Sequence, residues 1–512
     1  MKIKANAFND WSVFRMNLKE YAKYDGLGLA KLIKDKQISS KELIEDAFKQ
    51  INKLNPDFNA VVRTRIEKAL IEADQSVATQ GSFAGVPILL KDISQSIQGE
   101  PLTAGSKLLV NRISKKDSHY VSKIREAGFV VVGQTNTPEF GLKNITEPAL
   151  FGPTRNPWNP EYSSGGSSGG ASSSIASGMV PISGASDGGG SIRIPASFTG
   201  LVGLKPTRGR TPVGPGVGRQ WHGAAVDFAL TKSVRDSAAM LDALQTIQPD
   251  TAFQVPLYYG SYLDVLSKPL KKTLKIAYST KSPVGTPVSE EAIIAVHKTV
   301  KWLEQEGFIV EEHDNGVDGI RLMENYYIMN CGEMAADILT IEEAIGRDIT
   351  VNDLEIVSWV LRTAGQNISA VQFTRSIAEW DRAAAQMAKF NEEYDLYLTP
   401  ASADHAPKVG ELTHTAEQSA ELLKVNELTS SEQLALVYEM FKPSLTYTPF
   451  TQLANITGQP AISLPVHMTA SDLPVGVQFM APKGKEDWLL KIGALLEQSG
   501  IWVGQKGNPY CQ

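Results

Sequence analysis

Two spacings of hydrophobic residues along the chain predict alternating helices and strands. Between residues 25 and 54 the apolar side chains recur every three or four positions, which predicts two amphipathic helices. Residues 85–90, GVPILL, form a short apolar run that predicts a buried strand. A helical pattern at 118–127 leads through a glycine into another such run at 129–132. Helices that alternate with buried strands are typical of a sheet covered by helices on its faces.

The rest of the chain continues this alternation without an internal repeat or an obvious domain linker. Residues 318–390 have mostly helical spacing, whereas residues 406–432 are polar and irregular and predict a surface excursion. The closing part predicts three further strands, at 450–453, 461–466 and 475–481. We therefore predict one large α/β domain that spans residues 1–512.

One segment does not fit a simple pattern of helices and strands. Residues 163–191 contain 11 Ser and 9 Gly in 29 positions, a composition that in isolation suggests a flexible linker. Apolar residues such as Ile175, Met179 and Val180 lie inside the segment, and more follow it. They predict tightly folded backbone within a packed core, with Gly where no side chain fits. A true linker between two domains remains the alternative.

Composition narrows the class of protein. Apolar residues make up 42% of the chain and charged residues 21%, as in an ordinary soluble globular protein, and the net charge of −6 argues against nucleic acid as a partner. No run of 18 apolar residues predicts a membrane span, and the N-terminus, MKIKANAFNDWSVFRMNLKEY, lacks a signal-peptide core, so a cytoplasmic location is expected. Cys331 and Cys511 predict neither a disulfide framework nor a metal site.

Two kinds of serine nucleophile are conceivable in the Gly/Ser segment. Residues 165–169 and 166–170 each match G-x-S-x-G, the nucleophile elbow of α/β-hydrolases. The preceding NPWNPEYSS has two prolines and does not predict the strand that an elbow needs. An elbow also needs a histidine, and no sequence context distinguishes any of the candidates His222, His297, His313, His405, His414 and His467.

The other candidate nucleophile is Ser191, which directly follows Gly188, Gly189 and Gly190. Three glycines leave backbone N–H groups free to converge on one point, as the stabilisation of an oxyanion requires. The available base is Lys91, which follows an apolar run, because a desolvated lysine is partly neutral. The alternative is a lysine at a strand end whose stem reaches solvent. Serine–lysine pairs are a known variant of the catalytic triad.

The sequence resembles the amidase signature family. The stretch GGSSGGASSSIASGMVPISGASDGGGSIRIPASFTGLVGLKPTRGR is similar to the family signature, and so are GVPILLKDI, NITGQPAISLPV and LPVGVQFMAP. The resemblance implies a single α/β/α domain with a central mixed β-sheet covered by helices. Its core would comprise about 60–245 and 440–500, after N-terminal helices within 1–58. Residues 250–440, which the resemblance does not cover, would form a variable, mainly helical region that shapes the substrate pocket.

The resemblance also implies roles for individual residues. Ser191 would be the nucleophile, Lys91 the base, and Ser167, preceded by a cis peptide bond, the proton relay between them. The oxyanion would be bound by the backbone N–H groups of Gly188, Gly189, Gly190 and Ser191. Supporting roles fall on an ion pair and two hydrogen-bonding serines: Asp187, Arg193, Ser168 and Ser164. No cofactor and no metal ion are implied.

The residues after Ser191 bear on the substrate. SIRIP at 191–195 departs from the SIRQP of glutamine-dependent amidotransferase A subunits, and ASDGGGSIRIPAS is closest in spelling to the 6-aminohexanoate cyclic dimer hydrolase branch. That branch has a cysteine near its substrate, so Cys331 is expected in the pocket, with a buried structural cysteine as the alternative.

We therefore predict an amidase that acts on a small carboxylic amide through an acyl-enzyme. Cyclic-amide hydrolysis, an amidotransferase A subunit and an inactive amidase-like binding protein remain open, as does a homodimer.

Overall fold

The structure is a computed structural model that describes residues 18–76, 81–271 and 273–511. The first 17 residues of the predicted N-terminal region, which hold most of the stretch that lacks a signal-peptide core, lie outside the described part. Within it, no helix is both long enough and apolar enough to span a bilayer.

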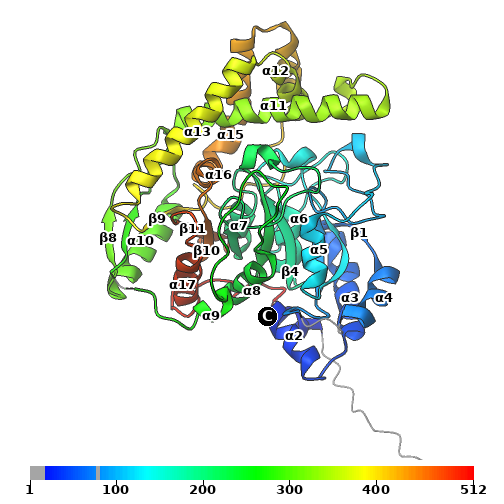
Figure 1. Cartoon of the computed structure of the whole chain (residues 1–512), viewed down its shortest axis with the longest axis vertical. Coiled ribbons are helices and arrows are strands. Elements are labelled where there is room, and N and C mark those ends of the chain that lie inside the picture. Colours follow the sequence, from blue (N-terminus) through cyan, green and yellow to red (C-terminus); the bar gives the residue numbers. More distant parts are fainter. Residues whose placement is uncertain (1–17, 77–80, 272, 512) are drawn as a thin grey trace, which may run out of the picture.

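A single β-sheet runs through the molecule (Figure 1). The described residues contain eleven strands in the order β1-β3-β2-β4-β6-β5-β10-β11-β9-β7-β8. The strands are β1 Val61–Thr64, β2 Pro87–Lys91, β3 Val130–Thr135, β4 Ile182–Asp187, β5 Val202–Lys205, β6 Val226–Thr231, β7 Lys275–Tyr278, β8 Ile309–Glu312, β9 Leu396–Pro400, β10 Ala461–Met468 and β11 Pro474–Met480. β2 pairs in parallel with β3 and β4, whereas β4 and β6 are antiparallel, so the sheet is mixed as predicted.

Helices flank this sheet and extend beyond it. They are α1 Leu18–Lys23, α2 Gly26–Lys34, α3 Ser40–Phe58, α4 Ile66–Ser76, α5 His119–Glu126, α6 Gly169–Ala176, α7 Arg193–Thr199, α8 Val234–Leu244, α9 Tyr262–Val265, α10 Glu290–Gln305, α11 Gly319–Ile345, α12 Ile356–Gly365, α13 Ala370–Phe390, α14 Ala416–Leu422, α15 Ser430–Tyr447, α16 Gln452–Thr457 and α17 Glu486–Glu497. Short 3₁₀ helices are η1 Lys107–Leu109, η2 Glu139–Gly141, η3 Gln220–Gly223, η4 Val351–Asp353 and η5 Leu423–Glu427. The predicted α/β fold with a central mixed sheet covered by helices is confirmed.

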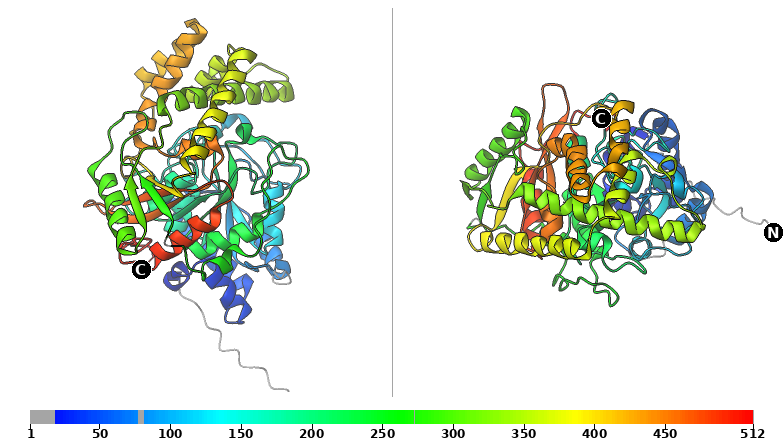
Figure 2. Two further views of the ribbon diagram at one scale, coloured as in Figure 1. Left: turned by 60° about the vertical axis from the view of Figure 1, so that its left-hand side comes forward. Right: turned by 90° about the horizontal axis from the view of Figure 1, so that it is seen from above.

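Two apolar clusters hold these layers together. The larger one joins the sheet to helices such as α3, α8 and α17, with Leu89, Leu230 and Leu464 fully buried in it. The second lies among α11, α12 and α15, which gather at one end of the molecule (Figures 1 and 2). The predicted helical region therefore forms a layer of its own, but it also supplies β7, β8 and β9 to the common sheet.

Two predictions about local structure are wrong. The stretch 450–453 is not a strand, and α16 begins within it. Its carbonyl groups bond to side chains rather than to a neighbouring strand: Phe450 O accepts from Gln478 Nε2 and Thr451 O from Arg193 Nη1. The polar stretch 406–432 is not irregular throughout, because α14, η5 and the start of α15 lie in it.

Capping boxes explain the helices in that polar stretch. Thr415 caps α14 together with Gln418, and Thr429 caps α15 together with Glu432. In each box the threonine hydroxyl accepts from a backbone N–H of the first turn, while the side chain three residues later accepts from the threonine N–H. The T-x-x-Q and T-x-x-E spacing was therefore a usable signal in a segment without apolar periodicity.

The Gly/Ser segment is packed backbone, and the linker alternative is wrong. All eight residues of α6, GGASSSIA, are buried. The serine hydroxyls bond to carbonyl groups in the interior, for example Ser172 Oγ to Ser164 O at 2.9 Å and Ser173 Oγ to Arg155 O at 2.8 Å. Glycine allows α6 to approach other backbone, since a Cβ on Gly170 would lie 2.6 Å from Ala60 O.

Substitution of Gly170 tests this close approach. An alanine ordinarily stabilises a helix interior relative to glycine, but here the added methyl meets the backbone of Asn136 and Ala60, which cannot move aside easily. We expect Gly170→Ala to lower the free energy of unfolding by about 1–3 kcal/mol, measured by urea denaturation. Gly500→Ala, at a position with open space around it, is the control and should change it by less than about 0.5 kcal/mol. Equal values for both variants would contradict the packing described.

Candidate active site

Lys91, the last residue of β2, is completely buried next to two serine hydroxyls. Its Nζ donates to Ser167 Oγ at 2.7 Å and to Ser186 Oγ at 3.0 Å. Burial lowers the pKa of Lys91 to about 7, although the negative charges of Asp227 and Asp187 oppose this shift. A lysine with this pKa is partly neutral at physiological pH and has the properties of a proton acceptor.

Ser167 lies at the start of the turn that leads into α6, and a cis peptide bond joins it to Gly166. Only 3% of its surface is exposed. The neighbouring Ser168 fixes this turn to β4, because its Oγ donates to Ser186 O at 3.2 Å. Ser164 contributes its carbonyl group, which accepts from Ser172 Oγ. These contacts fit the scaffold role expected for Ser168 and Ser164.

Ser191 lies in the turn between β4 and α7 and is half-buried. It lines the same cavity as Lys91 and Ser167. The glycines before it are oriented by their own hydrogen bonds. The N–H of Gly190 donates to Asp187 Oδ1 at 2.8 Å, so in this structure it is not available to an oxyanion, unlike the expectation for all four amides.

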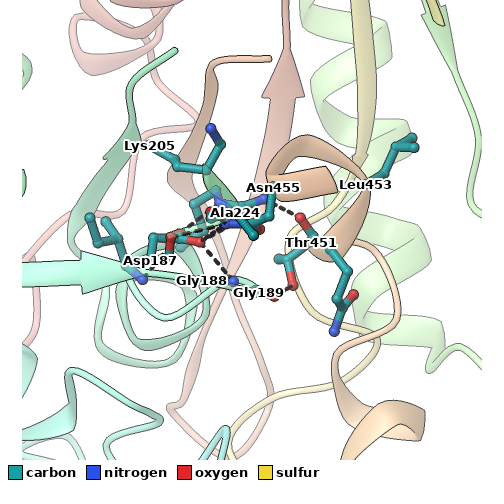
Figure 3. A network of polar contacts seen from close by, with 12 residues as sticks. Asp187, Gly188, Gly189, Lys205, Ala224, Thr451, Leu453 and Asn455 are labelled. Atoms are coloured by element: carbon teal, nitrogen blue, oxygen red, sulfur yellow. Dashed lines mark hydrogen bonds and ion pairs between the residues drawn. The ribbon is translucent and has the colours of Figure 1, made fainter. Parts of the chain in front are cut away.

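The carbonyl groups of the other two glycines are also held by hydrogen bonds, of which Figure 3 shows the one between Thr451 and Gly189. Tyr326 OH donates to Gly188 O at 3.1 Å, and Thr451 Oγ1 donates to Gly189 O at 2.6 Å. Since each peptide unit is planar, fixing its carbonyl also fixes the N–H of the following residue. Side chains from α11 and from the residue before α16 thus hold the glycine turn in place.

Asp187 and Arg193 form the ion pair expected from the sequence, and both side chains are fully buried. The Arg193 guanidinium donates to both carboxylate oxygens of Asp187 at 2.9 Å. Its other N–H groups are satisfied as well, by Thr451 O (2.7 Å), Gln478 Oε1 (2.5 Å) and Asn455 Oδ1 (2.6 Å). A buried charge pair with all its hydrogen bonds made avoids the penalty of an unpaired buried ion.

The carboxylate side of this pair is equally satisfied. Asp187 accepts from the N–H groups of Gly190 and Ile192 and from Asn455 Nδ2. Figure 3 shows Asp187 beside Asn455. Burial alone would raise the pKa of Asp187, but the charge and hydrogen bonds of Arg193 lower it to about 2. The ion pair therefore stays intact at neutral pH and holds the turn that carries Ser191.

The cavity has a volume of about 110 Å³ and lies between the sheet and the helical layer. Its floor comes from Lys91, Ser167 and Ser191, and its roof from α11 and α15. Apolar side chains in the roof and walls include Ile93, Phe140, Leu142, Trp221, Met323, Tyr327, Phe441 and Leu445. Polar side chains such as Lys143, Asn144, Asn330 and Thr448 line the cavity as well. In the part of the chain that the structure describes, no three His, Cys, Asp or Glu side chains gather as metal ligands would.

Cys331 does not line this cavity, contrary to the expectation. It is fully buried in the apolar cluster of the helical layer, where burial raises the pKa of its thiol. At that point α11 packs against α12 so closely that a Cβ on Gly365 would overlap the carbonyl group of Cys331. Tyr326, Tyr327 and Asn330 form the face of α11 that reaches the cavity instead. The structural alternative considered for Cys331 is the correct one.

Ser186 and Asp227 are site residues that the sequence did not single out. Ser186 is on β4 and bonds to Lys91, and Asp227 is its partner on the neighbouring strand β6. Ser186 was hidden among eleven serines of one segment. Asp227 was the better signal, because a carboxylate stands in the otherwise apolar strand VDFALT. A buried acid in such a strand needs a nearby cation or several hydrogen bonds.

Removal of the Arg193 charge tests the ion pair. Arg193→Met leaves the Asp187 carboxylate buried without a counter-ion, and we expect the free energy of unfolding to fall by about 3–5 kcal/mol in guanidinium titrations. The control is Arg321→Met, whose guanidinium is 59% exposed in a surface pair with Glu379 and should matter by less than about 1 kcal/mol. A similar decrease in the free energy of unfolding of the two variants would show that the buried ion pair stabilises the fold no more than a surface pair does.

Known proteins resemble this chain over most of its length. A family model for amidases matches residues 42–490. A lipoamidase from Enterococcus faecalis is 39% identical over 480 residues, which cover 94% of this chain but 64% of that protein, so the chain spans less than two thirds of it. A 6-aminohexanoate-cyclic-dimer hydrolase from Pseudomonas sp. (strain NK87) is 35% identical over 489 residues, or 94% of this chain and 96% of the relative.

Solved structures give the same result. A 6-aminohexanoate cyclic dimer hydrolase complexed with substrate matches with a TM-score of 0.85 and 32% identity, over 97% of this chain and 100% of the other. A bacterial aryl acylamidase matches with a TM-score of 0.83 and 25% identity, over 96% and 99%. The resemblance seen in the sequence is confirmed by these matches. The chain belongs to the amidase signature family and is an amide-hydrolysing enzyme.

Proposed function

We propose that this enzyme hydrolyses small carboxylic amides with Ser191 as nucleophile, Ser167 as proton relay and Lys91 as base. The observation that carries the proposal is the buried Lys91 amine, bonded to Ser167 Oγ at 2.7 Å in a cavity that Ser191 also lines. A catalytic base must be within hydrogen-bond reach of the proton that it accepts and must have a pKa near the working pH. Lys91 satisfies both conditions towards Ser167.

The first half of the reaction forms the acyl-enzyme. Ser191 Oγ attacks the amide carbonyl carbon while its proton passes to Ser167 Oγ, and the Ser167 proton passes to neutral Lys91. Backbone N–H groups of Gly188, Gly189 and Ser191 stabilise the oxyanion of the tetrahedral intermediate. The C–N bond then breaks, and the leaving amine receives the proton that returns from Lys91 through Ser167.

The second half releases the acid. A water molecule attacks the ester carbonyl of the acyl-enzyme and gives up its proton to Lys91 by the same relay. Collapse of the second tetrahedral intermediate breaks the bond to Ser191 Oγ, which regains a proton. The carboxylic acid leaves and the enzyme returns to its starting state, without any cofactor in the cycle.

The apolar part of the cavity wall offers a place for an apolar acyl group. Aromatic and aliphatic side chains from η2, α11 and α15 surround the space above Ser191, and contact with an acyl chain removes their surface from water. A relative that is 39% identical is named lipoamidase, and its name points to an acyl group of this kind. We therefore propose amides of medium-length apolar acids, lipoamide first, as substrates. The cyclic dimer of 6-aminohexanoate, named for another relative, is the second candidate.

Substitution of Lys91 tests the base. Lys91→Met keeps an apolar stem of similar shape, and we expect the rate of amide hydrolysis to fall by at least about 10³-fold because no group remains to accept the Ser167 proton. A fluorophosphonate should label Ser191 in the wild type and not in Lys91→Met or Ser191→Ala. In the wild type, kcat/KM should rise about tenfold per pH unit below the Lys91 pKa of about 7 and level off above it.

Stability provides the control for this variant. The pKa of Lys91 is about 7 in the folded protein and about 10.4 in an unfolded chain. The unfolded state therefore binds the lysine proton more tightly, and the buried lysine destabilises the fold at every pH below about 10. Lys91→Met lacks this penalty, so at pH 7 its free energy of unfolding, measured by denaturant titration, should be at least as large as that of the wild type. Wild-type turnover in a folded Lys91→Met enzyme would refute the mechanism.

A substrate panel tests the acyl preference. We expect kcat/KM for lipoamide and octanamide to exceed that for acetamide by at least about 10²-fold, since several methylene groups are buried at about 0.8 kcal/mol each. Phe441→Ala, which removes part of the cavity roof, should reduce this ratio while acetamide hydrolysis changes little. Comparable rates for acetamide and octanamide would contradict an apolar acyl site, and preferential hydrolysis of the cyclic dimer would favour the second candidate.

A further inference from the structure

Asp227 is a buried acid beside the proposed base, and the mechanism above does not use it. In the antiparallel pair of β4 and β6, Asp227 is the register partner of Ser186, whose Oγ accepts from Lys91 Nζ at 3.0 Å. Partner residues of an antiparallel pair point to the same face of the sheet, with Cβ atoms about 5 Å apart. Asp227 and the Lys91 amine therefore lie on one face, on either side of Ser186.

Hydrogen bonds tie Asp227 to the residues that follow Lys91 in the chain. Its Oδ1 accepts from Ser94 Oγ at 2.6 Å and from Gln95 Nε2 at 3.3 Å. The Oε1 of the same Gln95 accepts from the backbone N–H of Lys91 at 2.8 Å. Asp227 is only 4% exposed, so these bonds fix a carboxylate that has almost no contact with solvent. Gln95 thus connects the acid to the backbone of the base.

Asp227 differs from Asp187, the other acid near the Lys91 amine, in having no ion-pair partner among the described residues. Two acids act on Lys91, namely Asp227 and Asp187. The charge of Asp187 is balanced by Arg193 at 2.9 Å. Asp227 makes no ion pair with any residue that the structure describes, and Tyr120, which faces it from α5, is neutral and donates its OH to Phe228 O. Arg208 lines a second cavity together with Asp227, but its guanidinium donates to the carbonyl groups of Gly223, Asn455 and Ile456. The charge of Asp227 is therefore available to act on Lys91.

We propose that Asp227 is a positioning residue that sets the basicity of Lys91 by holding a negative charge beside its amine. The inference rests on the proposed role of Lys91 as the base. A completely desolvated amine is a weak base, because nothing stabilises the ammonium ion that forms when it accepts a proton. The Asp227 carboxylate supplies that stabilisation from the neighbouring strand and so lets Lys91 take the proton of Ser167.

The electrostatics of both groups agree with this role. Burial lowers the pKa of Lys91 to about 7, and the Asp227 charge is the largest influence that opposes the decrease. Burial raises the pKa of Asp227 to about 6, while Ser94, Gln95 and Lys91 stabilise its ionised form. The charged forms of Lys91 and Asp227 therefore stabilise each other.

The test is the pH dependence of Asp227→Asn. The amide keeps the shape and an oxygen acceptor for Ser94 but carries no charge, so the pKa of Lys91 falls further. We expect the acidic limb of the pH profile of kcat/KM to move to lower pH by about one unit or more. The plateau of the profile should drop because the neutral lysine is a weaker base. The pH dependence of Ser191 labelling by a fluorophosphonate should shift in the same direction. A limb at the wild-type pH in a folded variant would overturn the proposal.

Asp92→Asn is the matched control. Asp92 is also fully buried and directly follows Lys91, but its carboxylate pairs with Arg63 and accepts from Thr103. A merely structural effect of losing a buried acid should appear in both variants as lower stability. Only Asp227→Asn should move the acidic limb, and an equal shift in Asp92→Asn would also overturn the proposal.

A second variant keeps the test decisive if Asp227→Asn does not fold. Ser94→Ala leaves the acid in place but removes its 2.6 Å hydrogen bond, which raises the pKa of Asp227 and weakens its charge near neutral pH. The acidic limb should move in the same direction by a smaller amount, and an unchanged limb would count against Asp227. Turnover by Lys91→Met would instead refute the proposed function itself, so the two failures are distinguishable.

Discussion

The exclusion of water from the end of β2 is the constraint on which the site depends. A lysine there has no solvent to stabilise its ammonium form, and this burial lowers its pKa to about 7 against the opposing charges of Asp227 and Asp187. The strands on both sides, β3 and β4, and the packed helix α6 create that dry environment. The unusual Ser and Gly content of the α6 segment follows from it, because small residues let backbone pack where water would otherwise enter. The exclusion of water thus accounts both for the packing of α6 and for the lowered pKa of Lys91.

Because water is excluded, burying any other charge near the site costs free energy. The structure compensates for this cost differently at Asp187 and at Asp227. Asp187 and Arg193 neutralise each other, with hydrogen bonds from β11, the turn before α16 and α16 itself to every remaining polar group. Asp227 accepts hydrogen bonds from Ser94 and Gln95 and forms no ion pair with any of the described residues. The first arrangement gives rigidity to the turn of Ser191. The second leaves a charge available to act on Lys91, and that difference distinguishes a structural acid from a functional one.

Sequence patterns predicted what is local and missed what depends on register. Lys91, Ser167 and Ser191 stand in motifs that can be read along the chain, and the alternation of helices and strands predicted the α/β fold. The partnership of Ser186 with Asp227 depends on how β4 and β6 align, which no local pattern encodes. Apolar residues at 450–453 predicted a strand because the pattern does not show that Arg193 and Gln478 would take its carbonyl groups. Cys331 was misplaced because position on α11 was inferred without knowing which face meets α12.

The cavity lies between two parts of the chain: the proposed reacting residues on one side and the helical layer on the other. Its floor comes from Lys91 at the end of β2 and from Ser167 and Ser191, whereas its roof comes from α11 and α15, which belong to a separate apolar cluster. The hydrogen bond from Tyr326 to Gly188 joins the roof to the glycine turn. Roof side chains that do not touch the glycine turn, such as Phe441, can therefore change without breaking the contacts that hold Ser191. Substitutions in α11 and α15 can therefore change the shape of the pocket while the same serines and lysine remain below it.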